Sequence, residues 1–205
     1  MASIKWVLFD LGGVLLEVEQ SRIFEAFARV PGCLLVPAEV EAKIRSAKLF
    51  WSGFMEREIS PEELARFFNM LLKTQLSEGE VVEAVNAELG ATIASTAELL
   101  PGLRKIVQVG CLSNTNSIHW EQLLSTYEFM GHFDRRFASQ MLGCAKPDNT
   151  IYEKVEQMLE VDARSILFFD DRQENIDAAA RLGWNARLYV GAEQLRKDLR
   201  EFSLA

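Results

Sequence analysis

The segment IKWVLFDLGG, residues 4–13, joins a short apolar run to one aspartate and two glycines. The run at 4–9 is almost continuously hydrophobic, which is typical of a strand buried on both faces of a parallel sheet. Ligands of open α/β sheets bind beyond the carboxyl ends of the strands, where Asp10 would lie. Asp10 is therefore a candidate catalytic group, and the missing side chain at Gly12 becomes informative.

Composition narrows the classes of partner. The 205 residues are 49% hydrophobic and 25% charged, which suits one domain, or a core with an inserted unit. The formal net charge of −8 argues against nucleic acid or an anionic membrane as the main partner. An anionic small molecule stays possible, because a bound metal or one local cation can invert the field inside a cleft. The sequence leaves the oligomeric state open.

The expected location is the cytoplasm. We find neither a signal-peptide pattern nor an apolar run of the roughly 18 residues that a membrane span needs. Cys33, Cys111 and Cys144 are odd in number and widely spaced, so they predict neither a disulfide framework nor a zinc site.

Further apolar runs alternate with helical patterns after residue 100. The runs lie at 107–112, 165–169 and 185–190. Between them, Thr150 and Glu153 have the spacing of a capping box ahead of an amphipathic helix. This alternation predicts an α/β fold, with a Rossmann-like parallel sheet and helices on both faces.

Residues 18–90 are expected to be helical only. Ser21 would open one helix, Val40 to Trp51 mark a second, and Ser60 and Ser77 cap two more, the last ending at Gly90. We therefore expect an all-helical cap at 18–90, inserted into a core domain of residues 1–17 and 91–205.

Polar side chains stand where the apolar runs end. They are Asp10, Ser113, Asn114, Asp170 and Asp171, with Lys146 in a loop before the helix near Thr150. Carboxylates bind Mg²⁺ through oxygen, and a lysine can neutralise phosphoryl oxygens, so this set suits Mg²⁺-assisted phosphoryl transfer. Each residue also has a structural interpretation, as a strand end, turn former, helix cap or solvated lysine.

Four stretches resemble motifs of one family in the correct order. They are FDLGGVL at 9–15, LSNTN at 112–116, AKPD at 145–148 and FFDDRQENIDAA at 168–179. The chain resembles a haloacid dehalogenase-superfamily phosphatase with a helical C1-type cap. MEREISPEE at 55–63 further resembles the caps of a branch that includes bacterial sugar-phosphate phosphatases, one of which acts on α-D-glucose 1-phosphate.

The resemblance implies a role for each motif residue. Asp10 would attack phosphorus and form an aspartyl-phosphate. Mg²⁺ would be bound by the side chains of Asp10 and Asp171 and by the Gly12 carbonyl. The phosphoryl group would be held by the Ser113 hydroxyl, the Asn114 backbone N–H and the Lys146 ammonium. Asp170 would support the metal shell, and Asn175 is a further supporting residue where many relatives have an acid.

Most phosphatases of this family carry a second aspartate at the position of Gly12, which protonates the leaving group and activates water. A general acid or base of this kind raises the reaction rate by about 10²–10⁴-fold. The chain would then favour leaving groups of low basicity, such as anomeric sugar oxygens, unless another residue supplies the proton. Glu17 and Glu19 are the nearest acids in sequence.

The expected function is Mg²⁺-dependent hydrolysis of a small phosphorylated metabolite, for which a sugar phosphate is one candidate. Two alternatives remain. A degenerate family member could bind phosphate or a protein without useful turnover. A 2-haloacid dehalogenase also lacks the second aspartate, but such relatives tend to lose the acidic metal ligands, and here Asp170 and Asp171 are present.

Overall fold

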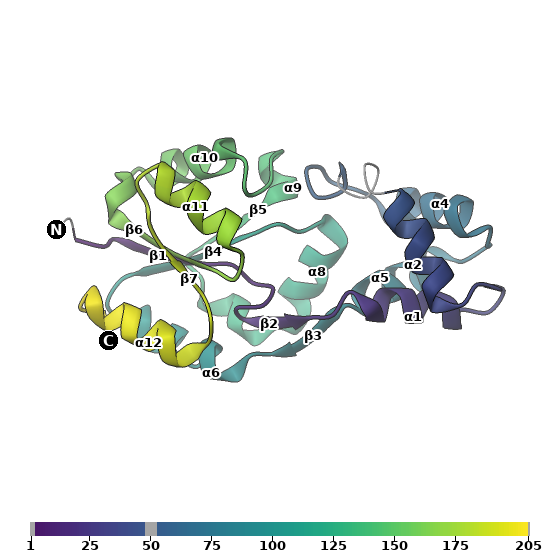
Figure 1. The fold of residues 1–205 in the computed structure, drawn as a ribbon, viewed down its shortest axis with the longest axis horizontal. Coiled ribbons are helices and arrows are strands. Elements are labelled where there is room, and N and C mark those ends of the chain that lie inside the picture. Colours follow the sequence, from purple (N-terminus) through teal and green to yellow (C-terminus); the bar gives the residue numbers. More distant parts are fainter. Residues whose placement is uncertain (1–2, 48–52, 205) are drawn as a thin grey trace.

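A computed structural model describes residues 3–47 and 53–204 of the chain. The structure has a larger lobe around a twisted sheet and a smaller lobe of helices, joined by a two-stranded ribbon (Figure 1). The large sheet has the order β5-β4-β1-β6-β7, and the ribbon is β2-β3. The strands are β1 Trp6–Phe9, β2 Leu16–Val18, β3 Leu89–Thr92, β4 Gln108–Ser113, β5 Arg135–Ala138, β6 Ile166–Asp170 and β7 Asn185–Leu188.

The helices divide between the lobes. Those of the smaller lobe are α1 Ser21–Arg29, α2 Pro37–Ser46, α4 Pro61–Leu72 and α5 Glu78–Asn86. Those of the larger lobe are α6 Ala94–Ala97, α7 Leu100–Leu103, α8 Ser117–Thr126, α9 Ser139–Leu142, α10 Asn149–Leu159, α11 Gln173–Arg181 and α12 Ala192–Glu201, with 3₁₀ turns at Glu128–His132 and Ala163–Ser165. No helix within these described ranges has both the length and the apolar character to cross a bilayer.

The central strand β1 explains why the larger lobe has three layers. Its side chains alternate between the two faces of the sheet. Val7 and Phe9 belong to one buried cluster with residues of α7, α8 and α12, whereas Leu8 belongs to another with residues of α10 and α11. All pairings in this sheet are parallel. The predicted Rossmann-like α/β fold, with helices on both faces of the sheet, is confirmed.

Three local features differ from what the sequence pattern predicts. Strand β5 was not predicted, because RRFA offers only two apolar residues and is stabilised by pairing with β4. Asp148, not Thr150, caps α10, since its side chain accepts a hydrogen bond from the Thr150 backbone N–H. Gly90 does not end α5 but lies inside β3, where the Glu17 backbone approaches too closely for a side chain.

The smaller lobe has a separate hydrophobic cluster, to which Ile118 of α8 also contributes. The stacked rings of Phe27 and Phe68 join α1 to α4 within a cluster that also draws on α2 and α5. Ser60 and Ser77 cap α4 and α5 as predicted. Helix α2 ends at Ser46, and the expected continuation to Trp51 lies outside the described residues.

The ends of the inserted segment are strands rather than helices. Residue 18 belongs to β2 and residues 89–90 to β3, which pair antiparallel. Helix α8 of the larger lobe packs against α5, and its Ser117 hydroxyl bonds both backbone groups of Ile59, accepting from N–H at 3.1 Å and donating to C=O at 2.8 Å. The two lobes therefore meet along α8 as well as at the ribbon.

Candidate active site

Lys146 is the centre of a buried polar cluster at the carboxyl ends of β1, β4 and β6. Its ammonium donates to the backbone carbonyl of Leu112 at 2.7 Å and to Asp170 Oδ2 at 2.7 Å, and lies 2.9 Å from Asp10 Oδ1. An ammonium has three N–H donors, so these three acceptors satisfy it. The Lys146 side chain is 1% exposed, which excludes its interpretation as an ordinary solvated lysine.

Asn114 fixes the backbone on which Lys146 stands. Its side-chain amide donates to the Lys146 carbonyl at 2.7 Å and accepts from the Lys146 N–H at 2.8 Å. Asn114 directly follows β4, so this pair ties the loop before α10 to the central sheet. The sequence suggested only a backbone contact from Asn114 to phosphate, whereas the structure gives its side chain this positioning contact as well.

Three carboxylates share the site with this one ammonium. Ligand oxygens of Asp10, Asp170 and Asp171 all lie within 4.8 Å of one another. Burial raises the pKa of Asp10 to about 6, with Lys146 opposing that shift and Asp170 adding to it. Burial and then Asp170 also raise the pKa of Asp171. Burial would lower the pKa of Lys146, but the two carboxylates outweigh it and the net shift is upward. The carboxylates thus carry more negative charge than Lys146 neutralises.

Asn175 completes the support of Asp170. Its amide nitrogen lies 2.9 Å and 3.0 Å from the two Asp170 carboxylate oxygens, while its own Oδ1 is buried without a partner. Asp170 is fully buried and also accepts from the Arg172 backbone N–H at 2.9 Å. An ionised acid at position 175 could not donate in this way. The amide therefore holds the carboxylate beside Lys146.

The two glycines after Asp10 have different surroundings. Gly13 has a φ of +73°, and a Cβ there would lie 2.2 Å from Asp171 Oδ2. Only glycine allows both that backbone angle and that approach. Gly12 is not in the left-handed region, and its nearest neighbour would be Val18 Cγ2 at 3.1 Å. The missing side chain at Gly12 is thus not forced by backbone conformation.

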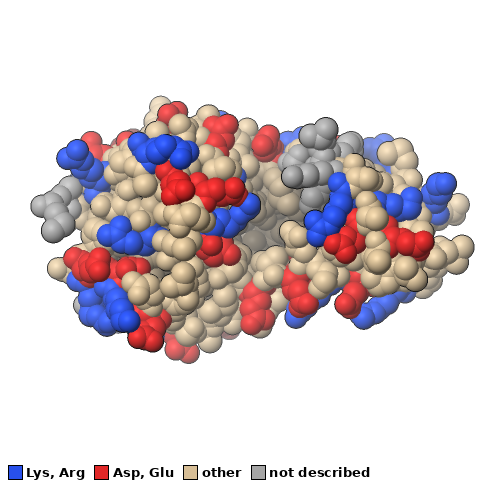
Figure 2. Space-filling view, in the orientation of Figure 1, with Lys and Arg blue, Asp and Glu red and all other residues tan. Residues whose placement is uncertain are grey.

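A cavity of about 580 Å³ opens onto this cluster where the two lobes meet. Figure 2 shows the surface hollowed between the lobes, with acidic and basic side chains scattered over both. From the larger lobe, the lining includes Asp10, Gly12, Ser113, Asn114, Lys146, Asp171 and Asn175. From the ribbon and the inserted segment it includes Val18, Gln20, Met55, Glu88 and Leu89. The structure therefore brings the predicted site residues together around one cavity. Asp170 does not line the cavity but contacts Lys146, which does.

Glu17 and Glu19, the acids nearest to Gly12 in sequence, do not line this cavity. Strand β2 alternates, so Leu16 and Val18 face the cavity while the exposed Glu17 does not. Glu19 accepts hydrogen bonds from the Ser21 hydroxyl and from Arg22, both at 2.9 Å. Neither glutamate is placed to act on a group bound beside Asp10.

Glu88 and His119 are cavity residues that the sequence analysis missed. Burial raises the pKa of Glu88 to about 7 and lowers the pKa of His119. Glu88 Oε1 lies 3.5 Å from His119 Nδ1. No periodicity marks Glu88, because it falls in the short connection between α5 and β3. Its position follows only from the pairing of β3 with β2.

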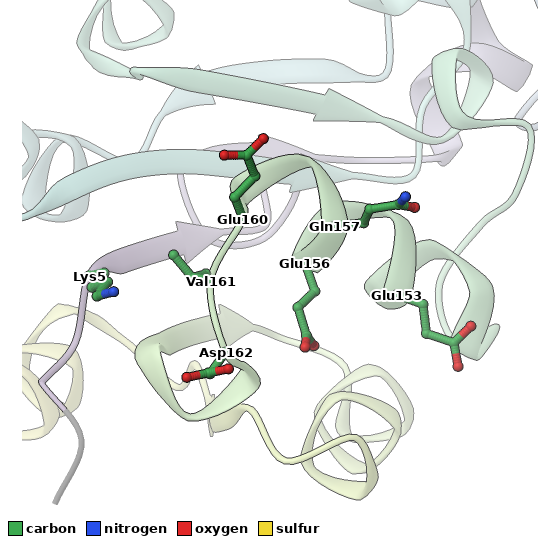
Figure 3. Close-up of a pocket in the computed structure, with 7 residues that line it drawn as sticks. All are labelled: Lys5, Glu153, Glu156, Gln157, Glu160, Val161 and Asp162. Atoms are coloured by element: carbon green, nitrogen blue, oxygen red, sulfur yellow. The ribbon is translucent and has the colours of Figure 1, made fainter.

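A second cavity, of about 460 Å³, lies away from this site. It is lined by Lys5, Glu153, Glu156, Gln157, Glu160, Val161 and Asp162. Figure 3 shows the carboxylates of Glu153 and Glu160 pointing in different directions rather than toward a common point. Among the described residues, the carboxylates with metal-ligand spacing are Asp10, Asp170 and Asp171.

Comparisons with known proteins agree with this arrangement. Phosphatase MT3486 of Mycobacterium tuberculosis (strain CDC 1551) is 27% identical, over 95% of this chain and 91% of that protein. D-ribitol-5-phosphate phosphatase of Bacteroides thetaiotaomicron is 26% identical, over 96% and 97%. The structure of HAD family enzyme bt-2542 from Bacteroides thetaiotaomicron, in complex with magnesium and inorganic phosphate, superposes with a TM-score of 0.80 at 27% identity, over 91% and 94%.

The family model for a haloacid dehalogenase-like hydrolase matches residues 4–183. That range contains every strand end that contributes to the cluster, from Asp10 after β1 to Asp170 at the end of β6. The match covers most of the chain and agrees with the parallel sheet and the convergent carboxylates, so the chain belongs to the haloacid dehalogenase-like hydrolases.

Proposed function

We propose that the protein is a Mg²⁺-dependent phosphatase that acts on a small phosphorylated metabolite through an aspartyl-phosphate on Asp10. In this proposal residues 18–90 form the cap and residues 1–17 and 91–205 form the catalytic core. The observation that carries the proposal is the junction of three carboxylates and one buried ammonium at the cavity floor. The phosphatase names of two relatives support the same reaction class.

The charge of the cluster fits a bound cation. Burial is the largest cause of the raised pKa values of Asp10 and Asp171, and the neighbouring Asp170 adds to both, so a cation bound between them would favour their ionised forms. Hard oxygen ligands suit Mg²⁺. We assign its ligands to the Asp10 and Asp171 carboxylates and the Gly12 carbonyl, with Asp170 in support. Bound Mg²⁺ would neutralise charge on the transferring phosphoryl oxygens.

The remaining groups attack the phosphoryl group or hold it in place. One Asp10 oxygen attacks phosphorus while the ammonium of Lys146 holds that carboxylate and the phosphoryl group in register. The Ser113 hydroxyl and the Asn114 backbone N–H donate to phosphoryl oxygens. Asn114 also keeps Lys146 in place through its side chain. Water then cleaves the aspartyl-phosphate and regenerates Asp10.

The substrate class that we propose is a sugar or polyol phosphate. The cavity of about 580 Å³ is of metabolite size, and Gln20, Glu88 and His119 give it polar walls beyond the phosphate site. One relative is a D-ribitol-5-phosphate phosphatase. The resemblance of residues 55–63 to caps of the glucose 1-phosphate branch supports the same class, and Met55 of that segment lines the cavity.

The decisive assay is hydrolysis of p-nitrophenyl phosphate with and without Mg²⁺ by the wild type and by Asp10→Asn. We expect Mg²⁺-dependent turnover that Asp10→Asn abolishes. A wild type that binds phosphate but turns over nothing would establish the binding-protein alternative. A screen of sugar and polyol phosphates then defines the substrate, with 2-chloropropionate as the dehalogenase control.

A further inference from the structure

We propose that Glu88, oriented by His119, is the proton donor and acceptor of the reaction, in the role for which Gly12 has no side chain. This inference rests on the proposed phosphatase function and adds to it a catalytic residue from the inserted segment. It also names His119 as a positioning residue on α8. Neither residue belongs to the four motifs that indicate the family.

Glu88 lies at the edge of the ribbon and lines the same cavity as Gly12. Val18 Cγ2 lies 3.1 Å from the point where a Cβ of Gly12 would be, and Val18 pairs with Leu89 across the two strands. The Glu88 carbonyl accepts a hydrogen bond from the Glu19 N–H at 3.0 Å, just before β3 begins at Leu89. Glu88 thus directly precedes Leu89, the residue that pairs with Val18. Glu88 and Asp10 line the same cavity.

His119 lies beside the Glu88 carboxyl. Its Nε2 lies 3.1 Å from the Val85 carbonyl, which can only accept, so Nε2 carries the ring proton. In the neutral ring Nδ1 is then an acceptor, 3.5 Å from Glu88 Oε1 and 3.3 Å from the Asn116 amide nitrogen. An Nδ1 acceptor suits a protonated carboxyl. The Nδ1 lone pair, which the Asn116 amide also approaches, therefore lies beside the Glu88 carboxyl, where a neutral acid is favoured over a carboxylate.

Burial tunes the pair for proton exchange near neutral pH. It raises the pKa of Glu88 to about 7, so near neutral pH this carboxyl exists in both its protonated and ionised forms, and it lowers the pKa of His119, which favours the neutral ring. The other charged groups that line the cavity are Asp10, Lys146, Asp171 and Arg172, and Arg172 is paired with Glu174. A carboxyl with a pKa near 7 is well matched to general acid–base catalysis.

The proton balances over the two steps. In the first, the Asp10–phosphorus bond forms, the bond from phosphorus to the leaving oxygen breaks, and Glu88 gives its proton to that oxygen. In the second, water attacks phosphorus, its proton passes to Glu88, and the Asp10–phosphorus bond breaks. Inorganic phosphate leaves, and both carboxyl groups return to their starting states.

The test compares leaving groups of different basicity. With Mg²⁺ present, kcat/KM is measured for p-nitrophenyl phosphate, whose leaving group departs without protonation, and for glycerol phosphate, whose leaving group needs it. The variants are Glu88→Gln and His119→Gln, with Glu17→Gln as the matched control because that glutamate is exposed on the same ribbon. The double variant Glu88→Gln with Gly12→Asp is the rescue.

We expect Glu88→Gln to lower kcat/KM for glycerol phosphate by about 10²–10³-fold and for p-nitrophenyl phosphate by less than tenfold. It should also remove a fall in kcat/KM for glycerol phosphate above about pH 7 in the wild type, since Glu88 is the acid there. Adding Gly12→Asp to Glu88→Gln should restore part of the activity on glycerol phosphate. His119→Gln should shift the pH above which kcat/KM for glycerol phosphate falls.

Equal losses on both substrates would assign Glu88 a merely structural role and overturn the inference, as would unchanged kinetics. A wild type active on p-nitrophenyl phosphate but inert on glycerol phosphate would also overturn it, because no proton donor would then be at work. A wild type inactive on every phosphate ester would overturn the phosphatase function itself, which distinguishes the two failures.

Discussion

The Lys146 ammonium lies 2.9 Å from the Asp10 carboxylate, and its third acceptor, the Leu112 carbonyl, belongs to the neighbouring strand β4. The nucleophile candidate on β1 is therefore held by a cation whose other contacts come from β4 and β6. Parallel strands place these groups at one edge of the sheet, and Lys146 joins them.

Lys146→Met should lower turnover of p-nitrophenyl phosphate by about 10²–10³-fold, the usual loss when a preorganised electrostatic group is removed. It should also destabilise the fold by about 3–5 kcal/mol, because Asp10 and Asp170 lose their buried partner. Urea denaturation measures that change. Lys154→Met is the matched control, since the Lys154 ammonium donates to the Leu142 carbonyl at 2.6 Å and does not line the cavity. Equal effects of the two variants would contradict the assignment.

Gly13→Ala should disrupt the site, whereas Gly12→Ala should be tolerated. Gly13 has a positive φ and its Cβ would collide with the Asp171 carboxylate, while the Gly12 Cβ would meet only a methyl group of Val18. We expect about 1–3 kcal/mol of destabilisation for Gly13→Ala. Thermal unfolding with and without Mg²⁺ checks this, and similar results for both variants would count against the glycine assignment.

Mg²⁺ should stabilise the protein against thermal unfolding. A ligand present at 100 times its Kd adds about 2.7 kcal/mol to the folded state. Asp171→Asn should remove most of the Mg²⁺-dependent rise in Tm, and Asp177→Asn, an exposed acid on α11, should leave it intact. A full Mg²⁺ response in Asp171→Asn would exclude Asp171 as a ligand.

The free energy of unfolding should depend on pH through the ionisation of the Glu88 carboxyl. Its pKa is raised from 4.5 to about 7 in the folded protein, so the unfolded chain ionises first as pH rises. The stability that the protonated carboxyl contributes is complete below about pH 4.5 and lost through about pH 7. One pKa unit is worth 1.36 kcal/mol.

The stability of the wild type should therefore fall relative to Glu88→Gln by about 2–3 kcal/mol between pH 5 and pH 8. Urea denaturation of both proteins at the two pH values measures this difference. Glu17→Gln, at an exposed position of the same ribbon, should show no such trend. A parallel pH response of wild type and Glu88→Gln would mean that Glu88 is solvated.

The core of the site could be predicted because it depends on local pattern. Short apolar runs identify β1, β4 and β6, and the residues that follow them must share one sheet edge, which brings together Asp10, Ser113 and Asp171. Lys146 stands on a loop that no periodicity places, and its position depends on the amide clamp from Asn114.

The acid–base residue could not be predicted from proximity along the chain. Glu17 and Glu19 are nearest to Gly12 in sequence, but strand alternation and the contacts with Ser21 and Arg22 keep them out of the cavity. Glu88 enters through the antiparallel pairing of β3 with β2, a long-range contact that sequence pattern does not encode.

Trapping the phosphorylated enzyme tests the central claim most directly. Wild type mixed with p-nitrophenyl phosphate and Mg²⁺ is quenched in acid, digested and analysed by mass spectrometry. We expect a phosphoryl group on the Asp10 carboxylate of the peptide from β1, and none in Asp10→Asn, which should also lack turnover. Steady turnover by Asp10→Asn, or wild-type turnover with water as the direct nucleophile and no phosphoryl group on Asp10, would contradict the account.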